Sequence, residues 1–130
     1  MRSESGERAR EQENTVPPRT CVLKIDKDCI VDYDWTRDYI RLVISTCKRF
    51  AVKVLRIRAS RSCRKGVHYY IDINPPVEAE LANRLQYLLG DDCQRVDFNR
   101  ARIASGLGEW SKLFEVAGRR LTTIYRRTAS

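Results

Sequence analysis

The residues from Val52 to Ile73 constrain the fold of this chain more than any other segment. Val52–Ala59 and Val67–Ile73 both alternate apolar and polar side chains, which is the pattern of strands with one buried face. The residues between them, Ser60–Gly66, are rich in Ser, Arg and Gly, as is typical of a turn. We therefore predict two strands joined by a basic turn, and the second strand carries His68, the only histidine of the chain.

The other periodic segments extend this pair to a β-α-β-β-α-β order. Cys21–Asp26 alternates like a strand, and Asp34 is a suitable N-cap for a helix over Trp35–Phe50. Asn74–Pro76 is expected to end the strand before it and to open a helix that runs to Leu89. The last third is expected to hold a strand over Arg95–Phe98, a short helix over Asn99–Ser105, and strands over Lys112–Val116 and Leu121–Tyr125.

This order predicts an α+β fold of the ferredoxin-like or RRM-like kind, a βαββαβ two-layer sandwich. We expect residues 1–20 to be a disordered tail, because they are polar, mix acids with arginines and end near two prolines. Residues 21–130 are expected to form one domain, with a core at 21–98 and an irregular C-terminal extension at 99–130. Two helices would cover one face of the sheet and leave the other face open.

The charge of the chain favours a polyanionic partner. Its net charge is +8, from 25 Lys+Arg against 17 Asp+Glu, and nucleic acid is the first candidate, with an inert basic surface as the alternative. No apolar run approaches the ~18 residues of a membrane span, and no apolar signal segment opens the chain, so we expect no membrane contact and a cytoplasmic location. The five cysteines form no Cys-x-x-Cys pair, which favours reduced thiols over a zinc site.

Strand parity gathers polar side chains on the open face of the predicted sheet. The positions expected to face the helices are Leu23, Ile25, Leu55, Ile57, Val67, Tyr69 and Ile71. The opposite face then carries Lys24, Asp26, Arg56, Arg58, His68, Tyr70 and Asp72. We expect phosphate contacts from Arg56, Arg58, Arg61, Arg64 and Lys65. His68 and Tyr70 would contact a base or a sugar.

Two acids at the end of the first predicted strand, Asp26 and Asp28, offer a second interpretation of the same face. Paired carboxylates can hold Mg²⁺ that is shared with substrate phosphates, and two such metals can serve nucleotidyl transfer. His68 would then hold the nucleotide phosphates through charge-assisted hydrogen bonds. The structural alternative is that the acids only end a strand and that His68 pairs with Asp72 or Tyr70.

These residues resemble the motifs of the archaeo-eukaryotic primase superfamily, whose catalytic core is RRM-like. Asp26-Lys27-Asp28 is similar to its acidic first motif, and Ser62–His68 is similar to its Ser-Gly-x-Gly-x-His turn, with one extra residue and the first glycine missing. The resemblance covers residues 21–98 and implies a reduced relative of the kind found beside archaeal and mobile-element replication genes. In an enzyme it would assign catalysis to Asp26, Asp28 and His68, and Mg²⁺ or Mn²⁺ binding to Asp26, Asp28 and Asp97.

The sequence therefore leaves three functions open. The first is nucleic-acid binding, DNA or RNA, in replication. The second is a minimal metal-dependent, primase-like nucleotidyltransferase. The third is a protein-interaction module that uses a sheet edge or the leucine stripe of the second helix, which could also pair two copies of the chain. A faint likeness of Lys65–Tyr69 to an RRM strand motif would place Tyr69, rather than His68, on the binding face.

Overall fold

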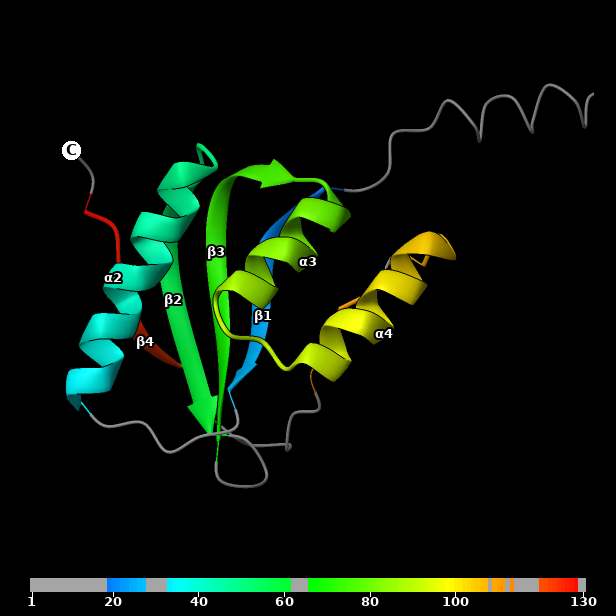
Figure 1. Cartoon of the computed structure of the whole chain (residues 1–130). Coiled ribbons are helices and arrows are strands. Elements are labelled where there is room, and N and C mark those ends of the chain that lie inside the picture. Colours follow the sequence, from blue (N-terminus) through cyan, green and yellow to red (C-terminus); the bar gives the residue numbers. More distant parts are fainter. Residues whose placement is uncertain are drawn as a thin grey trace, which may run out of the picture.

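A computed structural model describes residues 19–27, 33–61, 66–107, 109–111, 113 and 120–128. The described elements, in chain order, are β1 (Thr20–Lys27), α2 (Tyr33–Arg49), β2 (Lys53–Arg61), β3 (Val67–Val77), α3 (Ala79–Leu88), α4 (Cys93–Ala104) and β4 (Thr122–Arg126). The four strands form one antiparallel sheet in the order β1-β3-β2-β4 (Figure 1). The predicted α+β class is therefore confirmed. The expected N-terminal tail and most of the expected basic turn lie outside the described residues.

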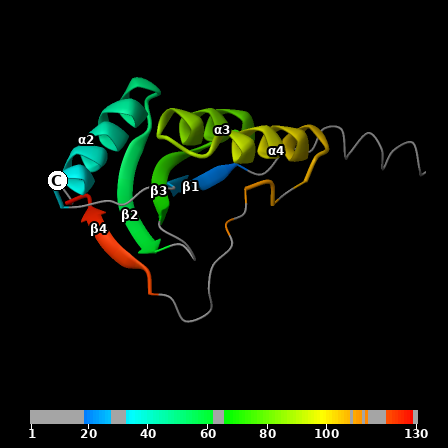
Figure 2. The same cartoon turned by 60° about the horizontal axis from the view of Figure 1, so that its bottom comes forward.

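All three described helices lie on the same side of the sheet. Figure 1 shows α2 in front of β2 and α3 in front of β3 and β1, with α4 beside α3. Figure 2 shows the helices as a layer above the strands, and no described helix covers the opposite face. Among the described helices, none is long and apolar enough to cross a bilayer.

The core follows the predicted strand parity on β1 and β3. Leu23, Ile25 and Ile71 are fully buried, and Tyr69 is 1% exposed, so these residues face the helices as expected. Tyr69 packs in an aromatic cluster, because its ring centroid lies 4.7 Å from that of Tyr39. The RRM alternative, which placed Tyr69 on the open face, is therefore wrong.

A β-bulge corrects the predicted parity of β2. The register between β2 and β3 shifts between Val54, which pairs with Ile73, and Arg56, which pairs with Asp72. An extra residue in one strand reverses the side of the residues beyond it. Leu55 is consequently 40% exposed, whereas Val54 is buried in its place.

One predicted boundary and one predicted strand are also wrong. The strand β3 does not end at Asn74–Pro76 but continues to Val77. Its pairing with β2 ends at Asn74, so the prolines, which lack an N–H donor, interrupt no bond to that strand. The expected strand over Arg95–Phe98 is instead the first half of α4, which begins because the side chain of Asp92 accepts a hydrogen bond from Gln94 N at 2.9 Å.

The expectations for the last third are otherwise mixed. The expected helix over Asn99–Ser105 is the second half of α4, which crosses the expected boundary between core and extension. The strand expected over Leu121–Tyr125 is confirmed as β4, one residue further along the chain. The strand expected over Lys112–Val116 lies outside the described residues except for Leu113, which is not in a strand.

The position of β4 distinguishes this sheet from the ferredoxin-like order, in which the last strand lies beside the first. Here β4 pairs with β2, and the free edge of β1 is covered by side chains instead. Lys24 N donates to Gln86 Oε1 at 3.0 Å, and Asp26 N donates to Asp91 Oδ1 at 2.9 Å. Arg95 Nη2 donates to Lys24 O at 3.1 Å. These bonds satisfy backbone groups that a neighbouring strand would otherwise pair, and the ferredoxin-like order is not confirmed.

Candidate nucleic-acid interface

The open face of the sheet carries its side chains in rows that cross the strands. Directly opposed residues of antiparallel strands point to the same face, so the register places them side by side. Three rows result, and their members are Val22, Asp72, Arg56 and Arg126 in the first, Lys24, Tyr70, Arg58 and Thr123 in the second, and Asp26, His68 and Ser60 in the third. The predicted open-face residues of β1, β2 and β3 are thus brought together.

Asp72 holds two arginines of this face in place. Arg56 Nε donates to Asp72 Oδ2 at 2.7 Å, and Arg58 Nη2 donates to Asp72 Oδ1 at 3.3 Å. The guanidinium of Arg58 also lies 5.9 Å from the centroid of the Tyr70 ring, which is a cation–π contact. Because these contacts fix the two guanidinium groups, less side-chain entropy remains to be lost when they bind an anion.

The half of the sheet formed by β2 and β4 is strongly basic. Neither Lys53–Arg61 nor Arg120–Thr128 contains an acid. Arg61 and Arg120 line a hollow on the helix side, together with Thr36 of α2 and Tyr69, so the predicted phosphate contact Arg61 does not join the open face. We call the remaining cations the basic margin: Lys53, Arg56, Arg58, Arg126 and Arg127. The pairing of β2 with β4 places residues far apart in the sequence next to each other, and Arg56 lies directly opposite Arg126. Like charges opposed across two strands repel, so this margin favours an anionic partner.

His68 lies on the predicted face but is not exposed. Its Nε2 atom lies 3.4 Å from Asp26 Oδ1, and its side chain is 5% exposed, against 32% for Asp26. The register explains this pair, because Asp26 and His68 are directly opposed on β1 and β3. Asp26 is consequently the more accessible member of the pair.

The expected metal ligands are not gathered by the structure. Asp28 lies outside the described residues, as do the predicted phosphate contacts Arg64 and Lys65. Asp97 lies on α4 rather than on a strand, and its carboxylate, in a side chain 76% exposed, lies 3.7 Å from Arg100 Nη1. Among the described residues, no three His, Cys, Asp or Glu side chains are grouped so that they could hold a metal ion.

A buried polar network around Asp91 holds the backbone of Asp26 in place. The sequence analysis did not predict this network. Gly90, with a φ of +93°, turns the chain after α3, and Asp91 N then donates to Gln86 O at 2.9 Å. The fully buried Asp91 carboxylate accepts from Arg95 Nε at 3.0 Å as well as from Asp26 N. Burial raises the pKa of the Asp91 carboxyl above its usual value, and the Arg95 charge opposes that shift. The spacing of four residues between Asp91 and Arg95 was the available sequence signal.

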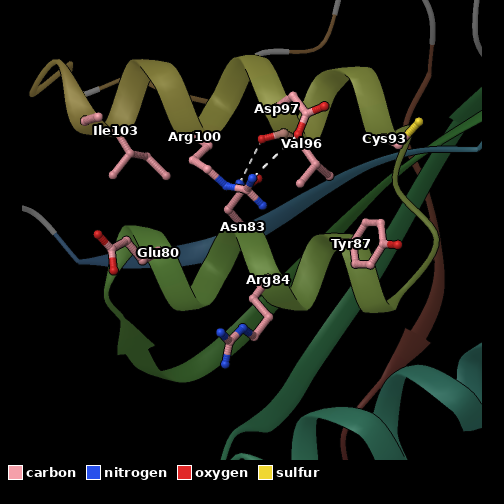
Figure 3. A pocket seen from close by; sticks show the side chains of 10 residues that line it. Glu80, Asn83, Arg84, Tyr87, Cys93, Val96, Asp97, Arg100 and Ile103 are labelled. Atoms are coloured by element: carbon pink, nitrogen blue, oxygen red, sulfur yellow. Dashed lines mark hydrogen bonds and ion pairs between the residues drawn. The ribbon is translucent and has the colours of Figure 1, made fainter.

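A hollow of about 690 Å³ lies between α3 and α4. Figure 3 shows Tyr87 and Cys93 at one end of it and Glu80 and Ile103 at the other. The charged residues that line it are of both signs: Glu80, Arg84, Asp97 and Arg100. Because these charges balance, the hollow lacks the excess of one sign that distinguishes the basic margin.

Comparison of the chain with known protein families, with curated proteins and with solved structures finds no match. No relative therefore supplies a function by similarity. The functional argument rests on the arrangement of the side chains described above.

Proposed function

We propose that this protein binds nucleic acid on the open face of its sheet. The observation that carries the proposal is the basic margin, where β2, β4 and the residue after β4 bring five cations together beside a single carboxylate, that of Asp72. The phosphodiester backbone of a nucleic acid is a common cellular partner for such a surface, because each phosphate that the protein neutralises releases condensed counterions. The net charge of +8 agrees with this partner.

The middle row of the open face suggests how a strand would lie on it. Arg58 and the half-buried Tyr70 are directly opposed, so a cation and an aromatic ring stand side by side at the centre of the sheet. Aromatic rings stack on bases with little dependence on sequence, while arginines contact the phosphates between them. This combination suits an unpaired strand, because the bases of a duplex are already stacked on each other.

Three finer assignments come from the sequence alone. They comprise an RRM-like sheet, a role in replication and a cytoplasmic location. The antiparallel sheet with helices on one face agrees with the layers of an RRM-like sheet, but its last strand pairs with β2 and not with β1. The second follows from the Asp-x-Asp and glycine-turn motifs alone.

Binding of fluorescent oligonucleotides across a salt series tests the proposal. We expect the protein to bind single strands, with affinity that falls steeply as salt rises. Arg56→Ala/Arg58→Ala should weaken binding about tenfold or more, since hydrogen bonds to charged groups contribute about 1.5–3 kcal/mol each. Loss of two phosphate contacts should also make the salt slope shallower by about 1.4.

The matched control is Arg41→Ala/Arg49→Ala, which removes the same charge from exposed positions of α2 on the helix side. It should change binding much less than the open-face variant. An equal loss in both variants would mean that net charge, and not this face, determines binding. Absence of binding even at low salt would contradict the proposal and favour the protein-interaction alternative.

A second candidate function is metal-dependent nucleotidyl transfer, favoured by the close pair of Asp26 and His68. Asp26 is 32% exposed and lies near the end of β1, 3.4 Å from His68 Nε2, which agrees with the metal-ligand role that the primase resemblance assigns to it. If the chain is such an enzyme, it should extend a primer with Mg²⁺ or Mn²⁺, and Asp26→Ala should abolish incorporation because a metal ligand is lost. Asp38→Ala, an exposed acid of α2, is the control. Tight nucleic-acid binding without incorporation by the wild type would exclude this function.

A further inference from the structure

We infer that the row formed by Asp72, Arg56 and Arg126 is a subsite for a phosphate group. This inference names the contact at one place within the proposed interface, and its nucleic-acid form rests on the proposed function. The row forms part of an open depression whose charged lining comprises Lys53, Arg56, Asp72, Arg126 and Arg127. Four cations therefore face a single carboxylate.

The carboxylate does not balance these cations. Both oxygens of Asp72 accept hydrogen bonds from Arg56 and Arg58, of which only Arg56 lines the depression. Within the described part of the chain, no acid forms an ion pair with Arg126 or Arg127. Positive charge is thus concentrated where the sheet register opposes Arg56 to Arg126.

The arrangement is built into the sheet and does not depend on loose side chains alone. Arg127 N donates to Leu55 O at 2.8 Å, which continues the pairing of the two strands past Arg126 and anchors both residues. Arg56 donates to Asp72 through Nε. Within the described part of the chain its Nη groups form no hydrogen bond, so they are available to a bound anion. Two opposed guanidinium groups can bind one tetrahedral anion between them with paired, charge-assisted hydrogen bonds.

Phosphate is the ligand class that fits this chemistry, and it has two sources in a nucleic acid. One is a phosphodiester inside the strand, and the other is a phosphate at the end of the strand. A 5′-phosphorylated oligonucleotide and its 5′-hydroxyl form distinguish them. Tighter binding of the phosphorylated form would place a terminal phosphate in the subsite, and equal binding would place an internal phosphodiester there.

The critical variant is Arg126→Gln, compared with Arg120→Gln. Both residues are exposed arginines, one just before β4 and one at its end, but only Arg126 lines the depression, whereas Arg120 lies outside the basic margin. We expect Arg126→Gln to weaken oligonucleotide binding about tenfold and Arg120→Gln much less, because only the first removes a directed hydrogen bond to phosphate. Equal effects of the two variants would overturn the subsite.

Inorganic phosphate alone provides a test that does not need nucleic acid. We expect phosphate to raise the melting temperature above that in chloride of equal ionic strength, and Arg126→Gln, but not Arg120→Gln, to remove the difference. Phosphate binding without oligonucleotide binding would support the subsite but contradict the proposed function. Oligonucleotide binding with no phosphate effect and no specific loss in Arg126→Gln would contradict the subsite and support the proposed function.

Discussion

Replacing Asp91 by alanine is expected to destabilise this protein by about 3–5 kcal/mol, the typical cost of breaking a buried ion pair. The variant leaves Arg95, whose side chain is 14% exposed, without its carboxylate. It also leaves Asp26 N at the β1 edge and Asp92 N without their acceptor, Asp91 Oδ1. Since small domains are stable by about 5–15 kcal/mol, such a loss is a large fraction of the total.

Urea unfolding of Asp91→Ala and Asp97→Ala would measure this effect. The control removes an acid from an exposed ion pair on α4, and surface pairs of this kind contribute about 1 kcal/mol or less. Arg95→Met and the double variant complete a cycle, in which the double variant should be more stable than the sum of the single losses predicts. A difference below about 1 kcal/mol between Asp91→Ala and Asp97→Ala would contradict the structural role of the network.

Tyr69→Ala is expected to reduce mainly the stability of the fold and Tyr70→Ala mainly the binding of nucleic acid, although the residues are neighbours in the sequence. Tyr69→Ala should cost about 3–5 kcal/mol, because it removes a buried ring from the cluster with Tyr39 and Trp35. Tyr70→Ala should cost far less stability, since its ring lies half-buried on the open face. It should instead weaken single-strand binding by about 1–3 kcal/mol through the loss of stacking.

Thermal unfolding and oligonucleotide anisotropy on the same two variants separate these roles. If Tyr69→Ala is too unstable to isolate, Tyr69→Leu keeps much of the apolar volume and should fold with a smaller loss of stability. A Tyr70→Ala variant that unfolds as readily as Tyr69→Ala would contradict the strand parity. A folded Tyr70→Ala variant that binds like the wild type would remove the stacking contact from the proposed function.

Where a strand is regular, the alternation of apolar and polar residues correctly predicted which residues face the helices. The alternation in β1 and β3 correctly predicted that Leu23, Ile25, Tyr69 and Ile71 face the helices, because side chains in a strand alternate between its faces. The same rule failed at Leu55, where a bulge adds one residue to β2. It failed again at Arg95–Phe98, because so short an apolar pattern suits a strand or a helix equally.

The candidate site was predicted in part for the same reason. Strand parity placed Arg56, Arg58 and Tyr70 on one face, and the register brings them together. It did not predict the burial of His68, which depends on what packs around the residue and not on the face that it occupies. The opposition of Arg56 to Arg126 was also beyond reach, because no local pattern specifies which edge of the sheet accepts the last strand.

The sequence by itself thus determined the α+β class, the polar face of the first three strands and the concentration of cations in Lys53–Arg61. These properties follow from side-chain period and composition within short segments. The tertiary structure alone decided that β4 pairs with β2, while Asp91 and Arg95 close the edge of β1. The reason is that these hydrogen bonds join backbone groups to partners dozens of residues away, and the choice between the two sheet edges depends on the packing of the whole domain.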